Sequence, residues 1–227
     1  MRTILGWAAL LVCLGLAAGA RAAPDPVFGS TDTPLSADVP LPQWQGLLER
    51  LAAEAPDYDA CRSGRPCPSE AARLWLQLLQ ELGSAPPAMQ LRDVNNFING
   101  WPYRPDSEAY GERDHWATPL EFLEHSGDCE DYAAIKYVSL RRLGFRPDRL
   151  RLVVVRDTAR KIAHAVLLAR LDQGWQVLDN LSDRILPPDR IDHYRPYYSV
   201  NEEMRWSHLQ PARPGDASSP SGADERD

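Results

Sequence analysis

The amino-acid sequence predicts an α+β fold, in which N-terminal helices pack against an antiparallel sheet. Apolar residues recur at helical spacing in the first part of the chain and alternate from residue 150 onward. Two strand-like runs, 162–171 and 175–178, are separated by turn residues, which is typical of a hairpin. Between the two regions, Cys129 stands where a helix is expected to begin. The sequence therefore predicts a helical part that carries a cysteine and a sheet that faces it.

Both ends of the chain are expected to lie outside the domain. Residues 1–22 contain an early arginine, an apolar run and the ending Ala20-Arg21-Ala22, which is typical of a cleaved secretory signal. Residues 23–42 are rich in proline, aspartate and serine and predict an extended lead-in. Residues 211–227 predict a disordered tail. We therefore expect one domain over residues 43–210 of an exported protein, and no later segment is apolar enough to cross a bilayer.

The net charge of the mature chain limits its partners. Residues 1–22 hold two of the 25 basic residues and none of the 32 acidic ones, so the mature charge is 23 minus 32, or −9. An acidic chain is a poor partner for nucleic acid or for an anionic membrane surface.

Three cysteines remain after processing. Cys61 and Cys67 bracket a short loop with Gly64 and Pro66, and in an oxidising compartment we expect them to form a disulfide. The alternative is that both are free surface thiols. In either case Cys129 is the unpaired cysteine that draws attention.

Three helices are expected before residue 99. The first covers Trp44–Ala55 and the third Met89–Ile98. Ser69 is expected to be the N-cap of the second helix. The inner face of this second helix is expected to consist of Leu74, Trp75, Leu78, Leu79 and Leu82. Residues 99–117, rich in Trp and Tyr, predict an irregular segment that either walls a cleft or covers the edge of the core.

A short helix and a long one follow. Thr118, Pro119 and Glu121 form the pattern of a capping box with proline at the first helical position, and this helix is expected to end by Gly127. The next helix is expected to run from Cys129 to Leu143. The free N–H groups and the dipole at a helix N-terminus favour a thiolate.

The hairpin predicts which residues share a face of the sheet. If Leu171 pairs with Gly174 across a two-residue turn, Asp179 lies opposite Val166, and His164 is on the same face. A turn one residue longer would put the two side chains on opposite faces. Taken singly, a strand histidine is usually a core or surface residue, and a strand-end aspartate is usually a turn cap.

Together, Cys129, His164 and Asp179 predict nucleophilic acyl chemistry. Cys129 would attack a carbonyl carbon, His164 would take and return the proton, and Asp179 would orient the imidazole. The backbone N–H of Cys129 is a candidate hydrogen-bond donor to the oxyanion of the reaction, and Trp116 is a weaker candidate for a second such donor.

Three acids flank the cysteine. Asp128, Glu130 and Asp131 suit a helix start, but carboxylates beside a nucleophilic thiol oppose thiolate formation. A bound calcium ion would remove that conflict. On these physical grounds, calcium binding and stabilisation of the helix N-terminus explain the three acids equally well. Zinc is disfavoured, because His125 precedes Cys129 by four residues but no further ligands cluster with it.

The block Gly127-Asp128-Cys129-Glu130-Asp131-Tyr132-Ala133 resembles the bacterial transglutaminase-like cysteine proteases. The preceding segment 116–123, Lys136-Tyr137 and Leu140-Arg141 match as well. So do the segments 164–167, 178–181 and 198–201, although many relatives have Met after the histidine where this chain has Ala165. The resemblance covers roughly residues 90–202.

This resemblance implies a papain-like fold and a calcium-dependent periplasmic protease that cuts a large cell-surface adhesin near its N-terminus, at a double-alanine type of site. Cleavage would release the adhesin and disperse a biofilm, and an inner-membrane receptor for cyclic di-GMP would sequester the protease. The resemblance implies Cys129, His164 and Asp179 as the triad. It implies Asp128 and Glu130, with Asp131, as calcium-associated acids.

Two other functions remain open at this point. The same thioester could be intercepted by an amine, which would make the protein a transglutaminase or acyltransferase. The chain could also be an inactive module that binds calcium for structural reasons.

Overall fold

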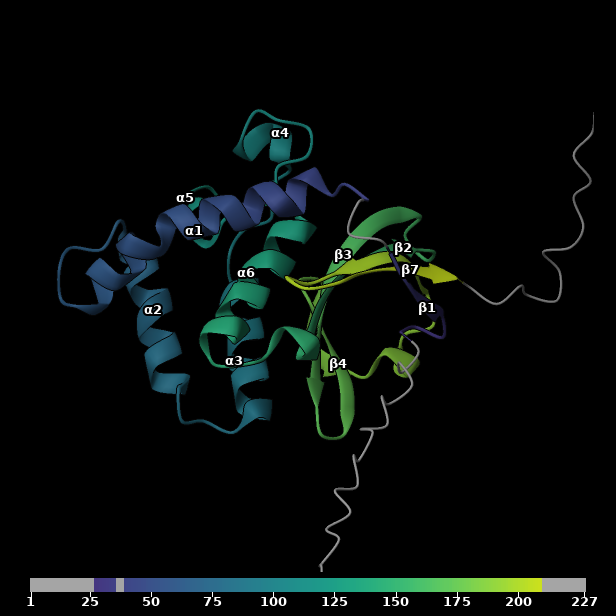
Figure 1. Cartoon of the computed structure of the whole chain (residues 1–227). Coiled ribbons are helices and arrows are strands. Elements are labelled where there is room, and N and C mark those ends of the chain that lie inside the picture. The colour runs from purple at the N-terminus through teal and green to yellow at the C-terminus, as the bar shows by residue number, and fades with distance from the viewer. Residues whose placement is uncertain (1–26, 36–38, 210–227) are drawn as a thin grey trace, which may run out of the picture.

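The structure is a computed structural model that describes residues 27–35 and 39–209. The predicted signal peptide and disordered tail lie outside the described residues. Helices gather on one side of the molecule and a twisted sheet lies on the other, as Figure 1 shows. This arrangement confirms the predicted α+β class.

The bounds of the helices are α1 (Pro42–Arg62), α2 (Glu70–Leu82), α3 (Pro87–Asn99), α4 (Asp106–Ala109), α5 (Pro119–His125) and α6 (Cys129–Arg142). All helices except α4 lie close to the predicted positions, and α4 lies within the segment 99–117 that was predicted to be irregular. Helix α1 continues beyond the predicted Ala55 and contains Pro56. In α5, Thr118 accepts from the backbone N–H of Glu121 at 3.3 Å, and the Glu121 side chain accepts from the N–H of Thr118 at 2.8 Å. The predicted capping box is therefore present.

The sheet has seven strands in the order β1-β7-β6-β2-β3-β4-β5. The strands are β1 (Thr31–Pro34), β2 (Leu150–Asp157), β3 (Ile162–Leu171), β4 (Gly174–Asp179), β5 (Ser182–Leu186), β6 (Tyr194–Val200) and β7 (Arg205–Leu209). Neighbouring strands run antiparallel throughout this sheet, and Leu171 lies opposite Gly174 as the two-residue turn requires. Strands β6 and β7 were not predicted, and β1 lies within the segment predicted as an extended lead-in.

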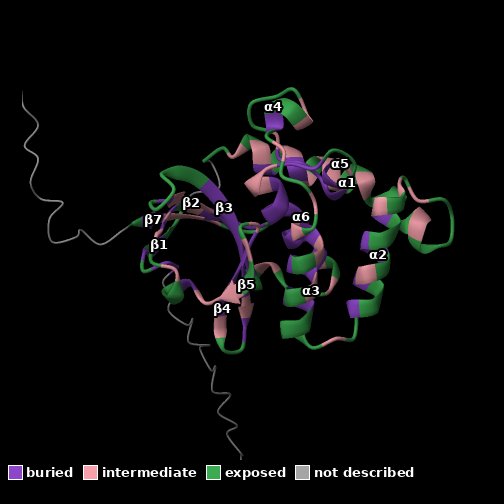
Figure 2. Ribbon diagram, turned by 180° about the vertical axis from the view of Figure 1, so that it is seen from behind, coloured by how far each residue is buried: buried purple, intermediate pink, exposed green. Residues whose placement is uncertain are grey.

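Helix α6 lies at the centre of the fold. It contacts β2, β3 and β4 on one side and α3 and α5 on the other, so every residue from Asp131 to Leu140 is buried. Figure 2 shows this helix as one of the most buried elements. The sheet and the helices thereby fix the N-terminus of α6, and with it Cys129, in one position.

The predicted inner face of α2 is partly wrong. Leu74 is 43% exposed, whereas Leu76 and Ala72 are buried with Trp75, Leu79 and Leu82. The apolar residues from Leu74 to Leu79 are interrupted only by Gln77, so the pattern itself does not define one face. The contacts of α2 with α1, α5 and α6 determine which of its side chains are buried. In one of these contacts the Trp75 indole N–H donates to Ser139 of α6 at 2.9 Å.

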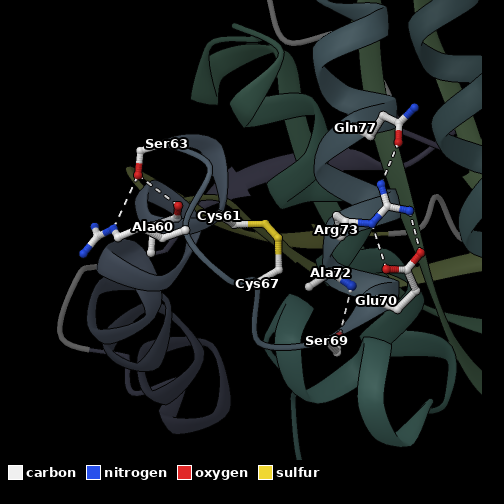
Figure 3. Close-up of a disulfide and its surroundings, with 10 residues drawn as sticks. Ala60, Cys61, Ser63, Cys67, Ser69, Glu70, Ala72, Arg73 and Gln77 are labelled. Atoms are coloured by element: carbon white, nitrogen blue, oxygen red, sulfur yellow. Dashed lines mark hydrogen bonds and ion pairs between the residues drawn. A yellow bond between two sulfur atoms is a disulfide. The ribbon is translucent and has the colours of Figure 1, made fainter.

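The predicted disulfide between Cys61 and Cys67 is present. It closes the loop from the end of α1 to the start of α2, as Figure 3 shows. Ser69 caps α2 by accepting from the backbone N–H of Ala72 at 3.0 Å. None of the helices in the described part of the chain combines the length and apolar character needed to span a bilayer.

Candidate active site

Cys129 is the first residue of α6 and is the one free cysteine among the described residues. Its Sγ lies 3.0 Å from Oε2 of Glu130. The residue before the N-cap, Gly127, must be glycine, because a Cβ there would lie 2.0 Å from Oδ2 of Asp131. The tight turn before α6 therefore brings the cysteine, its flanking acids and the buried Asp131 together.

Asp131 holds this turn in place. Its Oδ2 accepts from the backbone N–H of Asp128 at 3.0 Å, and its Oδ1 accepts from the N–H of Ala117 at 2.7 Å. The side chain is fully buried, and burial is the main reason why its pKa is raised to about 9. One carboxylate thus joins the start of α6 to the segment before α5.

His164 and Asp179 lie on one face of the sheet, as the hairpin parity predicted. Nε2 of His164 is 2.9 Å from Oδ1 of Asp179. Asp179 also accepts from the backbone N–H of Leu181 at 3.0 Å and from the hydroxyl of Tyr194 at 2.6 Å. Burial raises the pKa of Asp179, but the contact with His164 and these hydrogen bonds outweigh it, so the pKa is lowered on balance. The carboxylate is held ionised beside the imidazole.

A second layer of polar residues supports Asp179 from α3 and α6. The side-chain amide of Asn99 donates to the backbone carbonyl of Asp179 at 2.9 Å and to the carboxylate of Asp183 at 2.9 Å. Lys136 donates to Oδ1 of Asn99 at 2.6 Å. Lys136 is completely buried, which lowers its pKa to about 7. Helix α6 thus contacts the turn after β4 through two polar side chains.

Cys129 and His164 line one cleft of about 390 Å³. The backbone of Ala165, the residue after His164, hydrogen-bonds to the cysteine sulfur and favours the thiolate. Because Nε2 of His164 faces Asp179, its Nδ1 is the nitrogen left for a proton from the thiol. The structure therefore brings the three predicted catalytic residues into one site.

Without a cation, the surroundings of Cys129 oppose a thiolate. Burial raises the pKa of its thiol most, and the charges of Glu130 and Asp128 raise it further. This is the conflict that the sequence predicted for carboxylates beside a nucleophile.

The acidic cluster is larger than the sequence indicated. Carboxylate oxygens of Asp106, Asp114 and Glu130 lie within 4.8 Å of one another, and so do those of Asp106, Asp128 and Asp131. Buried oxygens of Asp106 and Asp128 (Oδ1 in each) have no hydrogen-bond partner among the described residues. Burial, then Glu130, raises the pKa of Asp128 to about 8. Clustered carboxylates with unpartnered oxygens fit a hard cation such as calcium.

Two residues that the sequence singled out, Trp116 and His125, have other partners in the structure. The indole N–H of Trp116 donates to Oδ1 of Asp114 at 3.1 Å, so it is engaged within the acidic cluster rather than free for an oxyanion. His125 belongs to none of the metal-competent groups in the described part of the chain, and its Nε2 lies 3.9 Å from Glu124.

Four residues of the site were not found from the sequence. They are Asp106, Asp114, Asn99 and Tyr194. The first two lie in the irregular segment 99–117, where no periodicity indicates which side chains point inward. Tyr194 lies in the unpredicted strand β6. The aromatic-rich composition of 99–117 was the one available signal that this segment walls a cleft.

The chain is similar to a known family of cysteine proteinases and to solved structures. Residues 79–213 match the family model described as bacterial transglutaminase-like cysteine proteinase. The structure is similar to Legionella pneumophila LapG, with a TM-score of 0.58 and 30% identity over 67% of this chain and 86% of that one. Calcium-bound LapG from the same organism gives a TM-score of 0.59 and 30% identity over 73% and 92%. No curated protein sequence matches the chain.

Proposed function

The chain belongs to the bacterial transglutaminase-like cysteine proteinases, and we propose that it is a periplasmic endopeptidase with Cys129, His164 and Asp179 as its catalytic triad. The observation that carries this proposal is the pairing of His164 with Asp179 at 2.9 Å, because His164 in turn lines one cleft with Cys129. A bound, oriented imidazole beside a helix-initial cysteine is the arrangement that thiol nucleophiles require.

The proposed reaction proceeds in two halves. Cys129 Sγ attacks the scissile carbonyl carbon while Nδ1 of His164 takes the thiol proton, and the backbone N–H of Cys129 donates to the developing oxyanion. The C–N bond then breaks, the leaving amine takes the proton from His164, and a thioester remains. Water gives its proton to His164 and attacks the thioester. The C–S bond breaks, and the proton returns to the sulfur.

We assign the acidic cluster to calcium. Asp128 and Glu130 would hold the ion together with Asp106 and Asp114, and Asp131 remains a ligand candidate through the lone pairs that its two hydrogen bonds leave free. The bound ion would supply positive charge that offsets the carboxylates around the thiol. The likeness to calcium-bound LapG supports this assignment.

The proposed substrate is a large cell-surface adhesin, cut near its N-terminus at a double-alanine type of site, with release of the adhesin and dispersal of the biofilm. We further propose that an inner-membrane receptor for cyclic di-GMP sequesters the protease. Family membership and the likeness to LapG support these assignments.

Incubation with an N-terminal adhesin fragment from the same organism tests the function. Wild-type protein should give two fragments, whereas Cys129→Ala and His164→Ala should give none while their melting curves stay cooperative. An added amine that becomes linked to the fragment in place of cleavage would instead show an acyltransferase. Absence of both products, with Cys129 unreactive toward an acyl probe, would indicate an inactive binding module.

Calcium removal tests the metal site. We expect EGTA to lower the melting temperature and slow cleavage, and calcium to restore both, because a ligand that binds the native state stabilises it. Glu130→Gln should weaken both responses. Glu124→Gln is a matched control, since Glu124 is exposed and outside the cluster. An unchanged melting temperature on calcium addition would overturn the assignment.

A further inference from the structure

The reactive cysteine borders a second hollow, distinct from the acidic cleft. It has a volume of about 200 Å³ and is lined by Cys129 and His164 together with Tyr103, Ile162, Ala163, Asn180 and Leu181. Tyr103 and the two reacting residues line both hollows, so the acidic cleft and this one meet at the cysteine.

The walls of this hollow are apolar and exposed. Tyr103 is 56% exposed, Ile162 is 46% exposed and Leu181 is 44% exposed. They come from three separate segments: the loop before α4, the start of β3 and the turn between β4 and β5. Covering apolar surface is favourable because it removes that surface from water. A cluster of such side chains around a nucleophile is therefore a surface that gains free energy when a ligand covers it.

The backbone of these walls is held in place. The N–H of Leu181 donates to Asp179, and the N–H of Arg104, next to Tyr103, donates to the carbonyl of Gly127 at 2.9 Å. The exposed side chains therefore project from segments that are fixed to the catalytic carboxylate and to the turn before Cys129. A wall anchored in this way can select a ligand by shape.

We infer that Tyr103, Ile162 and Leu181 form a substrate subsite that binds an apolar side chain on the acyl side of the scissile bond. This inference rests on the proposed function. The acyl part of the substrate stays bonded to Cys129 through both halves of the reaction, and a subsite that borders Cys129 can hold it throughout.

Peptidyl chloromethyl ketones test the subsite without a known substrate. Two series, acetyl-Xaa-Ala and acetyl-Ala-Xaa, carry Ala, Leu or Asp at Xaa. Alkylation forms a C–S bond to Cys129, releases chloride and passes the thiol proton to His164, and intact mass reports its rate. In one of the two series, we expect the compound with Leu at Xaa to react about tenfold faster than the compound with Asp at Xaa. For each variant, the alkylation rate is divided by its rate with iodoacetamide, a small reagent that reports the reactivity of the thiol without using a subsite.

Ile162→Ser and Leu181→Ser should each reduce the preference for Leu severalfold. Leu74→Ser, a comparably exposed leucine on α2, should leave it unchanged. Equal normalised rates for Leu and Asp in both series would overturn the subsite while leaving the proposed function intact. Failure of Cys129 to react even with iodoacetamide would instead count against the proposed nucleophile.

Discussion

His164 of β3 and Asp179 of β4 are joined across one hairpin, with Nε2 of the imidazole 2.9 Å from Oδ1 of the carboxylate. The same oxygen accepts from the N–H of Leu181, and the other accepts from Tyr194. Three groups, namely the Asp179 carboxylate, the Leu181 N–H and the Tyr194 hydroxyl, thus fix one edge of the imidazole. The opposite edge is left for the cleft that Cys129 and His164 line.

Asp179→Ala should slow acylation by about 10²–10⁴-fold, because the imidazole loses its orienting partner. Asp179→Asn should cost much less. The amide oxygen can still accept from His164 and Leu181, and the amide N–H₂ can donate to the Tyr194 hydroxyl oxygen. The rate of thioester formation with an acyl probe, measured in a single turnover, gives the loss in each of the two variants. Equal losses in the two variants would show that charge, rather than orientation, is the contribution of Asp179.

Gly127→Ala should destabilise the start of α6 and slow the alkylation of Cys129. The added Cβ would lie 2.0 Å from Oδ2 of Asp131, which is fully buried and cannot move aside. We expect a loss of at least about 1–3 kcal/mol in the free energy of unfolding. Gly46→Ala is the control, since its nearest neighbour is the end of the Arg50 side chain at 3.3 Å rather than a buried carboxylate at 2.0 Å. Thermal melts and iodoacetamide labelling report the two effects.

Stability in acid should depend on Asp32. Burial raises the pKa of this carboxyl, but His208 and Arg151 outweigh burial, so the pKa is lowered from its ordinary value of 3.8. A carboxyl whose folded-state pKa is depressed stabilises the fold fully above the unfolded value and loses that contribution as pH falls through the folded value. Urea unfolding should therefore show stability that drops below about pH 4.

Asp32→Asn should remove that part of the acid dependence and also destabilise the fold at neutral pH. Arg151 loses its buried anion, which costs about 3 kcal/mol or more. Asp172→Asn is the control, because its side chain is fully exposed beside Arg149. A wild-type protein and an Asp32→Asn variant with parallel acid profiles would contradict this account.

Reduction of the Cys61–Cys67 disulfide should lower the free energy of unfolding by about 2 kcal/mol, as expected for a short loop. The effect should be absent in a Cys61→Ser/Cys67→Ser variant, whose melting temperature no longer responds to a reductant. Cys129→Ser should keep the full response. If reductant also destabilises the double variant, the disulfide is not its target.

The sequence predicted the parts of the site that depend on local rules. Turn length alone fixed the parity that places His164 and Asp179 on one face, and capping chemistry located the start of α5. It missed the strand Thr31–Pro34, which pairs with β7 nearly the whole chain away. It also missed Asp106 and Asp114, because an irregular segment carries no period from which to read direction. Long-range pairing and loop conformation are decided by packing, not by neighbours in sequence.

The pairing of Thr31 with Leu209 brings the first and last strands together at one edge of the sheet. A short peptide could join them, and the chain could be reopened at the exposed tip Asp172-Gln173 between β3 and β4. Along such a circular permutant the three catalytic candidates would follow in the order Asp179, Cys129, His164. The folded structure, and not their order in the chain, brings these side chains together, so the permutant should still form the site.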